Sequence, residues 1–201
     1  MIKAVLFDLD GTIINSEEGI TKCVQYALSC FGIEEPDRKK LLYFIGPPLD
    51  PVFREKYGFD ADKAWQAVLK YRERFDKTGI FECELYEGVA DTIRKLKEAG
   101  CVIALASSKP ETACRRILEH FSLTPYFDEI VGSTLDGSIS TKQQVLEELG
   151  RRMEHMQITK DEMCLIGDTE YDVIGADQFG IRCVGVSYGF GKREQLERAG
   201  A

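Results

Sequence analysis

Two aspartates follow the first apolar run of the chain. Asp8 and Asp10 stand one residue apart in the stretch VLFDLDGT, directly after the apolar residues Ala4 to Phe7. Side chains at positions i and i+2 of a strand project to the same face, so both carboxylates are expected close together at the end of a buried strand. Like charges at that distance raise each other's pKa unless a cation or a proton shares the site. An isolated Asp-Gly pair is also a favoured turn, so the motif gains meaning only from complementary groups elsewhere.

Complementary groups follow three later apolar runs, each of which predicts a buried parallel strand. Ser107 and Ser108 follow the run near residue 101, where SSKPE matches a capping box and predicts a helix that begins directly after the serines. Lys142 opens a helix after the run near residue 129, and Asp168 and Asp172 follow the run near residue 163. Ligands of open α/β sheets bind beyond the carboxyl ends of the strands. Each group has an ordinary structural role when taken singly, but together they predict one site.

The apolar runs alternate with helical patterns along most of the chain. Five runs lack alternating polar residues and predict buried parallel strands: KAVLFDL, CVIALASS, EIVGS, MCLIGD and RCVGVS. Helical periodicity lies between them, at about residues 89–99, 113–121 and 145–153. This order predicts an α/β fold with a doubly wound parallel sheet, that is, a Rossmann-like core.

One segment interrupts the alternation, because residues 16–81 show helical periodicity and no convincing strand. We expect an all-helical cap domain at 16–81, inserted into a core domain formed by residues 1–15 and 82–201. Within the insertion, the prolines of IGPPLDPVF (Ile45 to Phe53) predict an irregular loop. A helix is predicted after this loop from four residues at helical spacing: Trp65, Val68, Leu69 and Arg72.

Composition restricts the classes of partner. The net charge of -8 and the pI of about 5.0 argue against a nucleic-acid polymer or an anionic membrane surface. The seven scattered cysteines include no CxxC pair and indicate thiols in a reducing compartment. No signal-peptide pattern and no apolar run of transmembrane length is found. These features predict a cytoplasmic globular protein.

The motifs resemble those of the haloacid dehalogenase-like superfamily of phosphohydrolases. DLDGT at Asp8–Thr12 is similar to the first motif of that superfamily, Ser107 to the second, Lys142 to the third and GDTEYD at Gly167–Asp172 to the fourth. The segments YEGV, SSKPE, IGPPL and GVSYGFG resemble phosphoglycolate phosphatase-like members, and most of all the 5′-nucleotidase-like branch. The chain departs from this pattern at Ile139, where relatives often carry an arginine, which leaves the substrate preference open.

The resemblance implies a Mg²⁺-dependent phosphatase that acts on a small phosphomonoester of the phosphoglycolate or nucleoside 5′-monophosphate type. Asp8 would attack phosphorus and form an aspartyl-phosphate, and Asp10 would serve as general acid and then as general base. The implied metal ligands are Asp8, the backbone carbonyl of Asp10, and Asp168. Oxygen ligands suit Mg²⁺ better than Zn²⁺, which prefers histidine and cysteine.

The resemblance also implies how the phosphate and the leaving group are bound. Ser107 and Lys142 would hold phosphate oxygens, with Ser108 beside them at a helix N-terminus. Asp172 would orient either Lys142 or the water molecules around the metal. In the cap, the candidates for contacting the leaving group are Pro47, Pro48 and Leu49 in the proline loop, and Arg72 and Arg74 on the following helix.

The sequence is also compatible with functions other than phosphate hydrolysis. A phosphosugar mutase shares the same core and the same motifs. A receiver-like phospho-switch module also combines an acidic cluster, Mg²⁺, a hydroxyl and a lysine, but it lacks a helical insertion and carries its phospho-acceptor on a middle strand. A catalytically silent binding protein would be expected to have lost a key aspartate, and none is missing. The expected partner in the phosphatase reading is a small phosphorylated metabolite.

Overall fold

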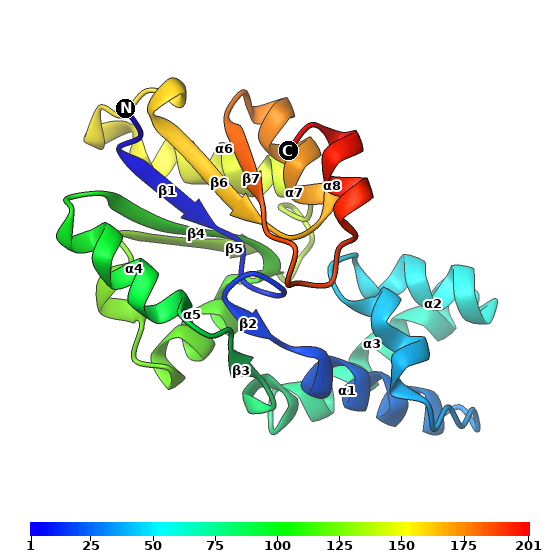
Figure 1. The fold of residues 1–201 in the computed structure, drawn as a ribbon. Coiled ribbons are helices and arrows are strands. Elements are labelled where there is room, and N and C mark those ends of the chain that lie inside the picture. Colours follow the sequence, from blue (N-terminus) through cyan, green and yellow to red (C-terminus); the bar gives the residue numbers. More distant parts are fainter. The chain divides into compact units, whose positions relative to one another are not determined.

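The computed structural model describes residues 1–201 and contains a five-stranded parallel sheet (Figure 1). The strand order is β5-β4-β1-β6-β7, with every neighbouring pair parallel. Each strand comes from one of the five predicted apolar runs: β1 (Ala4–Phe7), β4 (Val102–Pro110), β5 (Glu129–Ser133), β6 (Met163–Gly167) and β7 (Arg182–Gly185). The predicted fold class is therefore confirmed, and β1 occupies the middle of the sheet.

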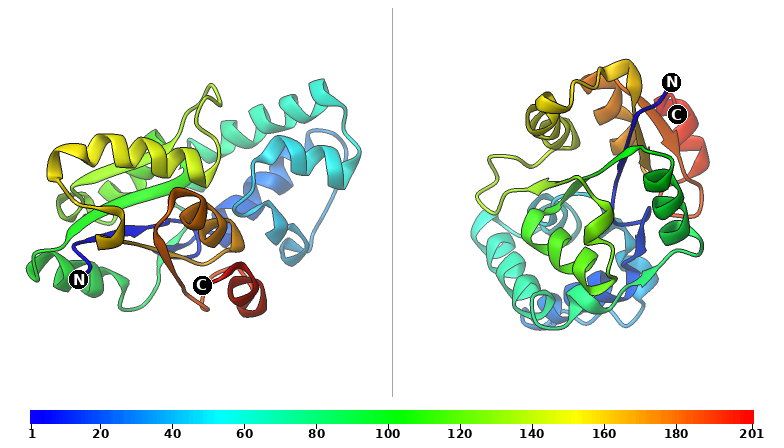
Figure 2. Two further views of the ribbon diagram at one scale, coloured as in Figure 1. Left: turned by 90° about the horizontal axis from the view of Figure 1, so that it is seen from above. Right: turned by 90° about the vertical axis from the view of Figure 1, so that its left-hand side faces the viewer.

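Helices cover both faces of this sheet (Figures 1 and 2). Alternate residues of β1, Ala4 and Leu6, pack into one apolar cluster with side chains of α6 and α7, as expected where successive strand residues face opposite ways. Helices α4 and α5 pack against β4 on the opposite face. The helices of the sheet unit are α4 (Val89–Glu98), α5 (Glu111–His120), α6 (Lys142–Met153), α7 (Glu170–Phe179) and α8 (Arg193–Ala199).

The chain divides into two compact units. One comprises Met1–Asn15 and Leu85–Ala201, and the other is the helical cap region Ser16–Glu84. Its main helices are α1 (Glu17–Ser29), α2 (Leu49–Tyr57) and α3 (Ala61–Phe75). Tilted aromatic contacts, such as Phe44–Phe53 at 4.8 Å between ring centroids, form part of its core. Two two-residue strands, β2 (Ile14–Asn15) and β3 (Glu84–Leu85), pair with each other, and the sequence analysis predicted neither.

The proline-rich loop is shorter than predicted. It ends at Pro48, and α2 begins at Leu49, so the expectation of an irregular segment as far as Phe53 is wrong. Pro51 falls in the first turn of α2, where a helix leaves its backbone N–H groups without intrahelical partners. A proline in that turn loses no hydrogen bond, and it is therefore compatible with the helix.

Helix α3 confirms the predicted helix, but only Val68 of the four residues on its predicted face is buried. Trp65 and Leu69 are 45% and 41% exposed, whereas Val68 and Tyr71 are buried together with two alanines, Ala64 and Ala67. The small alanines allow close packing of α3 against α1 and α2, which large residues at the same positions would prevent. Periodicity of large apolar residues was therefore a poor guide to the buried face of this helix.

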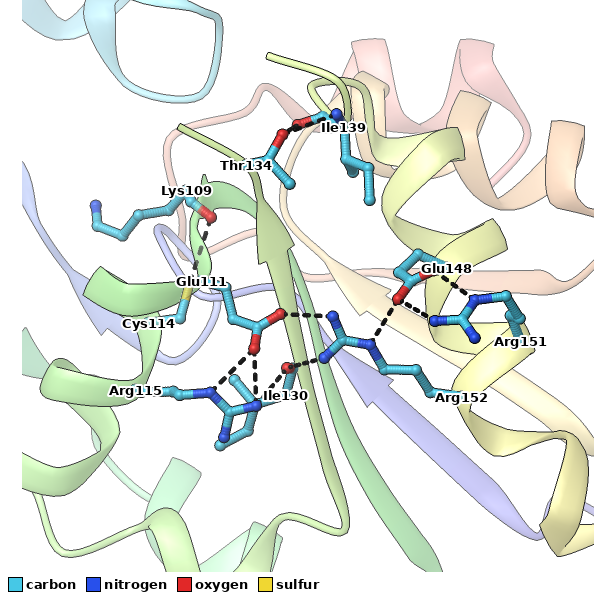
Figure 3. Close-up of polar contacts among 10 residues, drawn as sticks. All are labelled: Lys109, Glu111, Cys114, Arg115, Ile130, Thr134, Ile139, Glu148, Arg151 and Arg152. Carbon is cyan, nitrogen blue, oxygen red and sulfur yellow. Dashed lines mark hydrogen bonds and ion pairs between the residues drawn. The ribbon is translucent and has the colours of Figure 1, made fainter. Parts of the chain in front are cut away.

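Beside the edge strand β5, an ion-pair network joins α5 to α6 (Figure 3). The guanidinium groups of Arg115 and Arg152 both donate to the Ile130 carbonyl, at 3.2 and 3.4 Å. Glu111, at the start of α5, pairs with Arg115 at 2.8 Å and with Arg152 at 3.0 Å. The two arginines thus occupy a carbonyl of the edge strand that could otherwise pair with another chain. The network also fixes the start of α5 relative to α6.

The seven cysteines form no disulfide bond. None of the helices combines the length and the apolar character required to cross a membrane.

Candidate active site

The central strand β1 delivers Asp8 to the carboxyl edge of the sheet. The Asp8 backbone N–H donates to the Ile166 carbonyl at 2.9 Å, which continues the pairing of β1 with β6 by one residue. Asp168 follows β6, Asp172 lies in the first turn of α7, and Lys142 is the first residue of α6. All four side chains are buried. The fold thus brings together groups that are far apart in the sequence, as the strand-end pattern predicted.

Lys142 is the positive centre of this cluster. Its Nζ lies 2.6 Å from Asp8 Oδ1, 2.8 Å from Asp172 Oδ1 and 2.7 Å from the Ala106 carbonyl oxygen. The side chain is only 5% exposed. Burial lowers the pKa of Lys142, but Asp172 and Asp8 outweigh that effect and raise it above its ordinary value. Lys142 therefore carries a positive charge throughout the physiological pH range.

The carboxylates of Asp8, Asp168 and Asp172 converge, with one oxygen of each within 4.8 Å of the others. Burial, reinforced by Asp172 and Asp168 and opposed by Lys142, raises the pKa of Asp8 to about 7. Burial likewise raises the pKa of Asp168 to about 6, with the Phe190 backbone N–H acting in the opposite direction. Both carboxylates are held in an environment that penalises their charged forms.

This cluster has the properties of a divalent cation site. The cluster contains three carboxylates and one ammonium group, so two negative charges remain uncompensated when all are ionised. The donors are oxygens, which hard cations such as Mg²⁺ prefer. The Lys142 ammonium donates a hydrogen bond to Asp8 Oδ1, and the other Asp8 oxygen accepts no hydrogen bond from the protein. The residues present therefore fit a hard divalent ion.

The loop after β1 shapes one wall of the cluster. Gly11 has a positive φ of 84°, and a Cβ at this position would overlap the Asp168 carboxylate. Asp168 Oδ1 accepts from Thr12 Oγ1 at 3.3 Å, and Oδ2 accepts from the Phe190 backbone N–H at 2.7 Å. Sequence reasoning missed Phe190, because a residue that acts through its backbone leaves no signal in its side-chain type. Thr12 belongs to the DLDGT motif, which was its only signal.

Capping boxes set the positions of the lysine and the last aspartate. Thr141 and Gln144 form one at the start of α6, which places Lys142 at the first helical position. Thr169 and Asp172 form the other at the start of α7. Asp172 Oδ2 accepts from the backbone N–H and the hydroxyl of Thr169, at 3.0 and 2.8 Å. The capping bond leaves Asp172 Oδ1 to face Lys142.

The serines do not cap a helix, so the predicted capping box at SSKPE is wrong. Strand β4 continues through Pro110, and α5 begins at Glu111 without a side-chain cap. Pro110 disfavours helical geometry at the preceding residue and so keeps Lys109 extended. Ser107 is buried, and its Oγ accepts from the Lys109 backbone N–H at 3.3 Å, whereas Ser108 is partly exposed. Both serines still lie at the carboxyl end of β4, next to β1.

Asp10 lies outside the three-carboxylate cluster and pairs with Lys109. Both oxygens of Asp10 accept from the Lys109 ammonium, at 3.0 and 2.7 Å. Sequence reasoning missed Lys109 as a site residue, because the contact joins residues 99 positions apart and lysine side chains are normally solvated. The role of Asp10 as a metal ligand concerns its backbone carbonyl and stays a prediction.

The cap candidates belong to the helical unit. Pro47 and the exposed Pro48 end the loop before α2, and Leu49 is the first residue of that helix. Arg74 donates to both oxygens of Glu82, at 2.7 and 3.1 Å. Its guanidinium is thus engaged within the helical unit, which speaks against the predicted contact with a leaving group. The roles of the loop residues stay predictions.

Fold and motifs define the class of this protein. The model of the haloacid dehalogenase-like hydrolase family matches residues 5–186. The chain therefore belongs to the haloacid dehalogenase-like hydrolases, and it is a hydrolase of the phosphatase type.

Individual relatives narrow the similarity. The chain is 41% identical to a 5′-nucleotidase of Pseudomonas aeruginosa over 192 residues, which cover 96% of this chain and 86% of the relative. It superimposes with a TM-score of 0.93 on a predicted phosphatase from Clostridium acetobutylicum, at 46% identity, covering 100% of this chain and 92% of the other. A haloacid dehalogenase-like family hydrolase from Streptococcus pneumoniae matches with a TM-score of 0.89 at 28% identity, covering 99% and 91%.

Proposed function

We propose that this protein is a Mg²⁺-dependent phosphatase that hydrolyses a small phosphomonoester through an aspartyl-phosphate on Asp8. The observation that supports it most strongly is the buried cluster of Asp8, Asp168, Asp172 and Lys142 at the carboxyl edge of the sheet. In this cluster Lys142 holds one oxygen of Asp8, and the other oxygen accepts no hydrogen bond from the protein. That second oxygen supplies the lone pair that a nucleophile requires.

In the first step, a carboxylate oxygen of Asp8 attacks phosphorus, and the bond from phosphorus to the leaving oxygen breaks. Asp10 gives its proton to that oxygen, so the leaving group departs as an alcohol and Asp10 becomes a carboxylate. The phosphoryl group is then held on Asp8 as a mixed anhydride. Splitting the hydrolysis in this way replaces one difficult displacement with two easier ones.

In the second step, Asp10 takes a proton from a water molecule as the water oxygen bonds to phosphorus. The bond between phosphorus and the Asp8 oxygen breaks, which releases inorganic phosphate. Asp8 returns to its carboxylate form and Asp10 to its protonated form, so the cycle closes without another reactant. One residue thus serves as acid and base in turn.

The remaining site residues neutralise and orient the phosphate. Asp8, Asp168 and the backbone carbonyl of Asp10 would hold Mg²⁺, which stabilises negative charge on phosphate oxygens when bound. The Lys142 ammonium and the Ser107 hydroxyl, with Ser108 beside it, would bind the oxygens that are not transferred. Asp172 keeps Lys142 in place through their 2.8 Å contact.

For the substrate we propose a nucleoside 5′-monophosphate, because a relative with 41% identity is named a 5′-nucleotidase. Phosphoglycolate is the second candidate, on the motif resemblance. Residues 16–81 would act as a cap domain over the core formed by residues 1–15 and 82–201. In that cap, Pro47, Pro48 and Leu49 would contact the leaving group.

A substrate panel tests this proposal. Release of inorganic phosphate from nucleoside 5′-monophosphates, phosphoglycolate and sugar phosphates is compared by kcat/KM, with Mg²⁺ and with EDTA. We expect Mg²⁺-dependent turnover, highest for a nucleoside 5′-monophosphate. Interconversion of sugar phosphates without phosphate release would instead identify a mutase, and stable phosphorylation without turnover would identify a switch. Turnover that is indifferent to EDTA would exclude the metal's role.

A further inference from the structure

The side chains that form the ion pair between Lys109 and Asp10 are largely shielded from solvent. The two side chains are only 7% and 13% exposed, and the Lys109 Nζ contacts both carboxylate oxygens of Asp10. Removing one partner would leave the other charge poorly solvated and unpaired, so the contact is favoured. Surface ion pairs of the chain, by comparison, join side chains that are largely exposed, such as Arg193 and Glu197.

The backbone of Lys109 is anchored on several sides. Pro110 keeps it extended, its N–H donates to Ser107 Oγ at 3.3 Å, and its carbonyl accepts from the Cys114 thiol at 3.5 Å (Figure 3). Gly132 of β5 lies against the same peptide, because a Cβ there would come within 2.5 Å of the Lys109 carbonyl oxygen. The backbone that carries the Lys109 side chain is therefore held in one place.

The backbone of Asp10 is also fixed, whereas its side chain has no other support. Asp10 forms an isolated β-bridge with Ile14, and the neighbouring Gly11 N–H donates to the Ile14 carbonyl at 2.8 Å. The ammonium of Lys109 supplies both hydrogen bonds that the Asp10 carboxylate receives. Without Lys109, the carboxylate could rotate among its staggered side-chain rotamers.

We propose that Lys109 is a positioning residue that orients the Asp10 carboxylate for proton transfer. This inference rests on the proposed function, in which Asp10 exchanges a proton with the leaving group and with water. Each carboxylate oxygen has about two lone-pair sites. Lys109 occupies one at each oxygen, so one at each remains for the proton. A 1 Å misplacement of a reacting group costs about 10²-fold in rate, so fixing Asp10 matters for the reaction.

The leaving group distinguishes positioning from a structural role. Departure of an alkyl oxygen needs the proton from Asp10, whereas p-nitrophenolate leaves readily without one. If the ion pair merely joined β4 to the loop after β1, its removal would lower kcat/KM equally on both substrates. A pair that positions Asp10 affects mainly the alkyl substrate, and kcat/KM is the quantity to measure, because it covers the step in which the leaving group departs.

The experiment compares wild-type, Lys109→Met, Lys109→Arg and Asp10→Asn enzymes on p-nitrophenyl phosphate and on the best alkyl phosphate of the panel. General acid catalysis contributes about 10²–10⁴-fold, so we expect Lys109→Met to lose at least about 10²-fold in kcat/KM on the alkyl phosphate. The loss on p-nitrophenyl phosphate should stay below about 10-fold, a smaller share of the same range. Lys109→Arg keeps the charge and should recover part of the loss. Adding Lys109→Met to Asp10→Asn should cost nothing further on the alkyl phosphate.

Lys97 offers a matched control, because its ammonium contacts both oxygens of Asp128 far from the cluster. Lys97→Met should leave kcat/KM unchanged on both substrates. Equal losses on both substrates in Lys109→Met, or none on either, would overturn the positioning role while leaving the phosphatase proposal intact. A wild-type enzyme that hydrolyses neither substrate would instead overturn the proposed function. If Lys109→Met fails to fold, Lys109→Arg serves in its place. The quantity compared is then the ratio of kcat/KM on the alkyl phosphate to kcat/KM on p-nitrophenyl phosphate, and a ratio equal to that of the wild-type enzyme contradicts the proposal.

Discussion

Asp8 occupies a position that disfavours its charge. Burial beside Asp172 and Asp168 keeps its pKa raised to about 7 even though Lys142 lies 2.6 Å away. Ionisation of a group with a raised pKa lowers the stability of the fold, and such groups concentrate at functional sites. Mg²⁺ at this site would supply the missing positive charge. The same acidic cluster that lowers the stability of the metal-free protein would therefore bind the metal needed for phosphoryl transfer.

Replacing Asp8 tests the nucleophile directly. Asp8→Asn keeps the size of the side chain and removes the attacking oxygen's charge, so we expect turnover to fall by more than about 10³-fold, on the scale known for removing a catalytic nucleophile. The fold should persist, because Lys142 retains Asp172 and the Ala106 carbonyl. Phosphate release and circular dichroism check the two halves of this prediction. Retained activity would remove Asp8 as the nucleophile.

At the residue scale, sequence reasoning predicted the groups that end strands or begin helices and missed those defined by tertiary contacts. Asp8, Asp168 and Lys142 converge because parallel strands place their carboxyl ends at one edge. Lys109 and Phe190 were missed. Lys109 belongs to the site only through its long-range contact with Asp10, and Phe190 contacts Asp168 only through its backbone N–H. Neither contact has a periodic or compositional signal.

Helices α6 and α7 pack closely enough for a lysine stem to cross between them. Gly175 on α7 provides the space, since a Cβ there would lie 2.6 Å from Lys142 Cγ and 2.7 Å from Lys142 Cβ. The capping box at Thr141 fixes the start of α6, and with it the root of the lysine. The start of α6 and the absence of a side chain at Gly175 thus determine where the Lys142 ammonium lies.

Gly175→Ala therefore links packing to activity. Overpacking costs about 1–3 kcal/mol, which should lower the melting temperature by several degrees. The displaced Lys142 should also reduce kcat/KM by about 10-fold or more, because one misplaced electrostatic contact is costly to the transition state. Gly150→Ala on α6 is the matched control, since its Cβ would meet Phe179 at 2.9 Å and not the lysine. If both variants lose activity equally, packing alone explains the effect.

At the element scale, the five strands and their alternation with helices followed from apolar runs that lack polar alternation. Element boundaries were harder. Pro110 ended the strand later than the capping pattern suggested, and Pro51 entered the first turn of α2 instead of ending a loop. Strands β2 and β3 have two residues each, too few for any periodicity to register.

For the whole molecule, the acidic cluster couples stability to pH and metal. The pKa values of Asp8 and Asp168 are raised in the fold, to about 7 and about 6. Each group therefore contributes stability that is fully present below its unfolded pKa of about 4 and is lost as the pH rises through the folded value. The metal-free protein should lose stability from about pH 4 to pH 7 through these two groups.

Mg²⁺ should restore that stability, and more strongly at high pH. A ligand at about 100 times its Kd stabilises by about 2.7 kcal/mol, which corresponds to a melting temperature higher by about 5–10 °C. At pH 5 protons compete for the same carboxylates, so the shift between EDTA and Mg²⁺ should be smaller than at pH 8. Thermal unfolding at both pH values measures it. A shift that is equal at both, or larger at pH 5, contradicts a site built on these carboxylates.

In the proposed mechanism, Asp8 accepts the phosphoryl group and Asp10 is needed to remove it. The most direct measurement uses Asp10→Asn enzyme mixed with substrate and Mg²⁺, quenched in acid and analysed by peptide mass spectrometry. We expect the peptide containing Asp8 to gain the mass of one phosphoryl group, located on Asp8, and we expect Asp8→Asn to abolish this signal. A phosphoryl group on another residue, or none while the wild-type enzyme turns over, would contradict it.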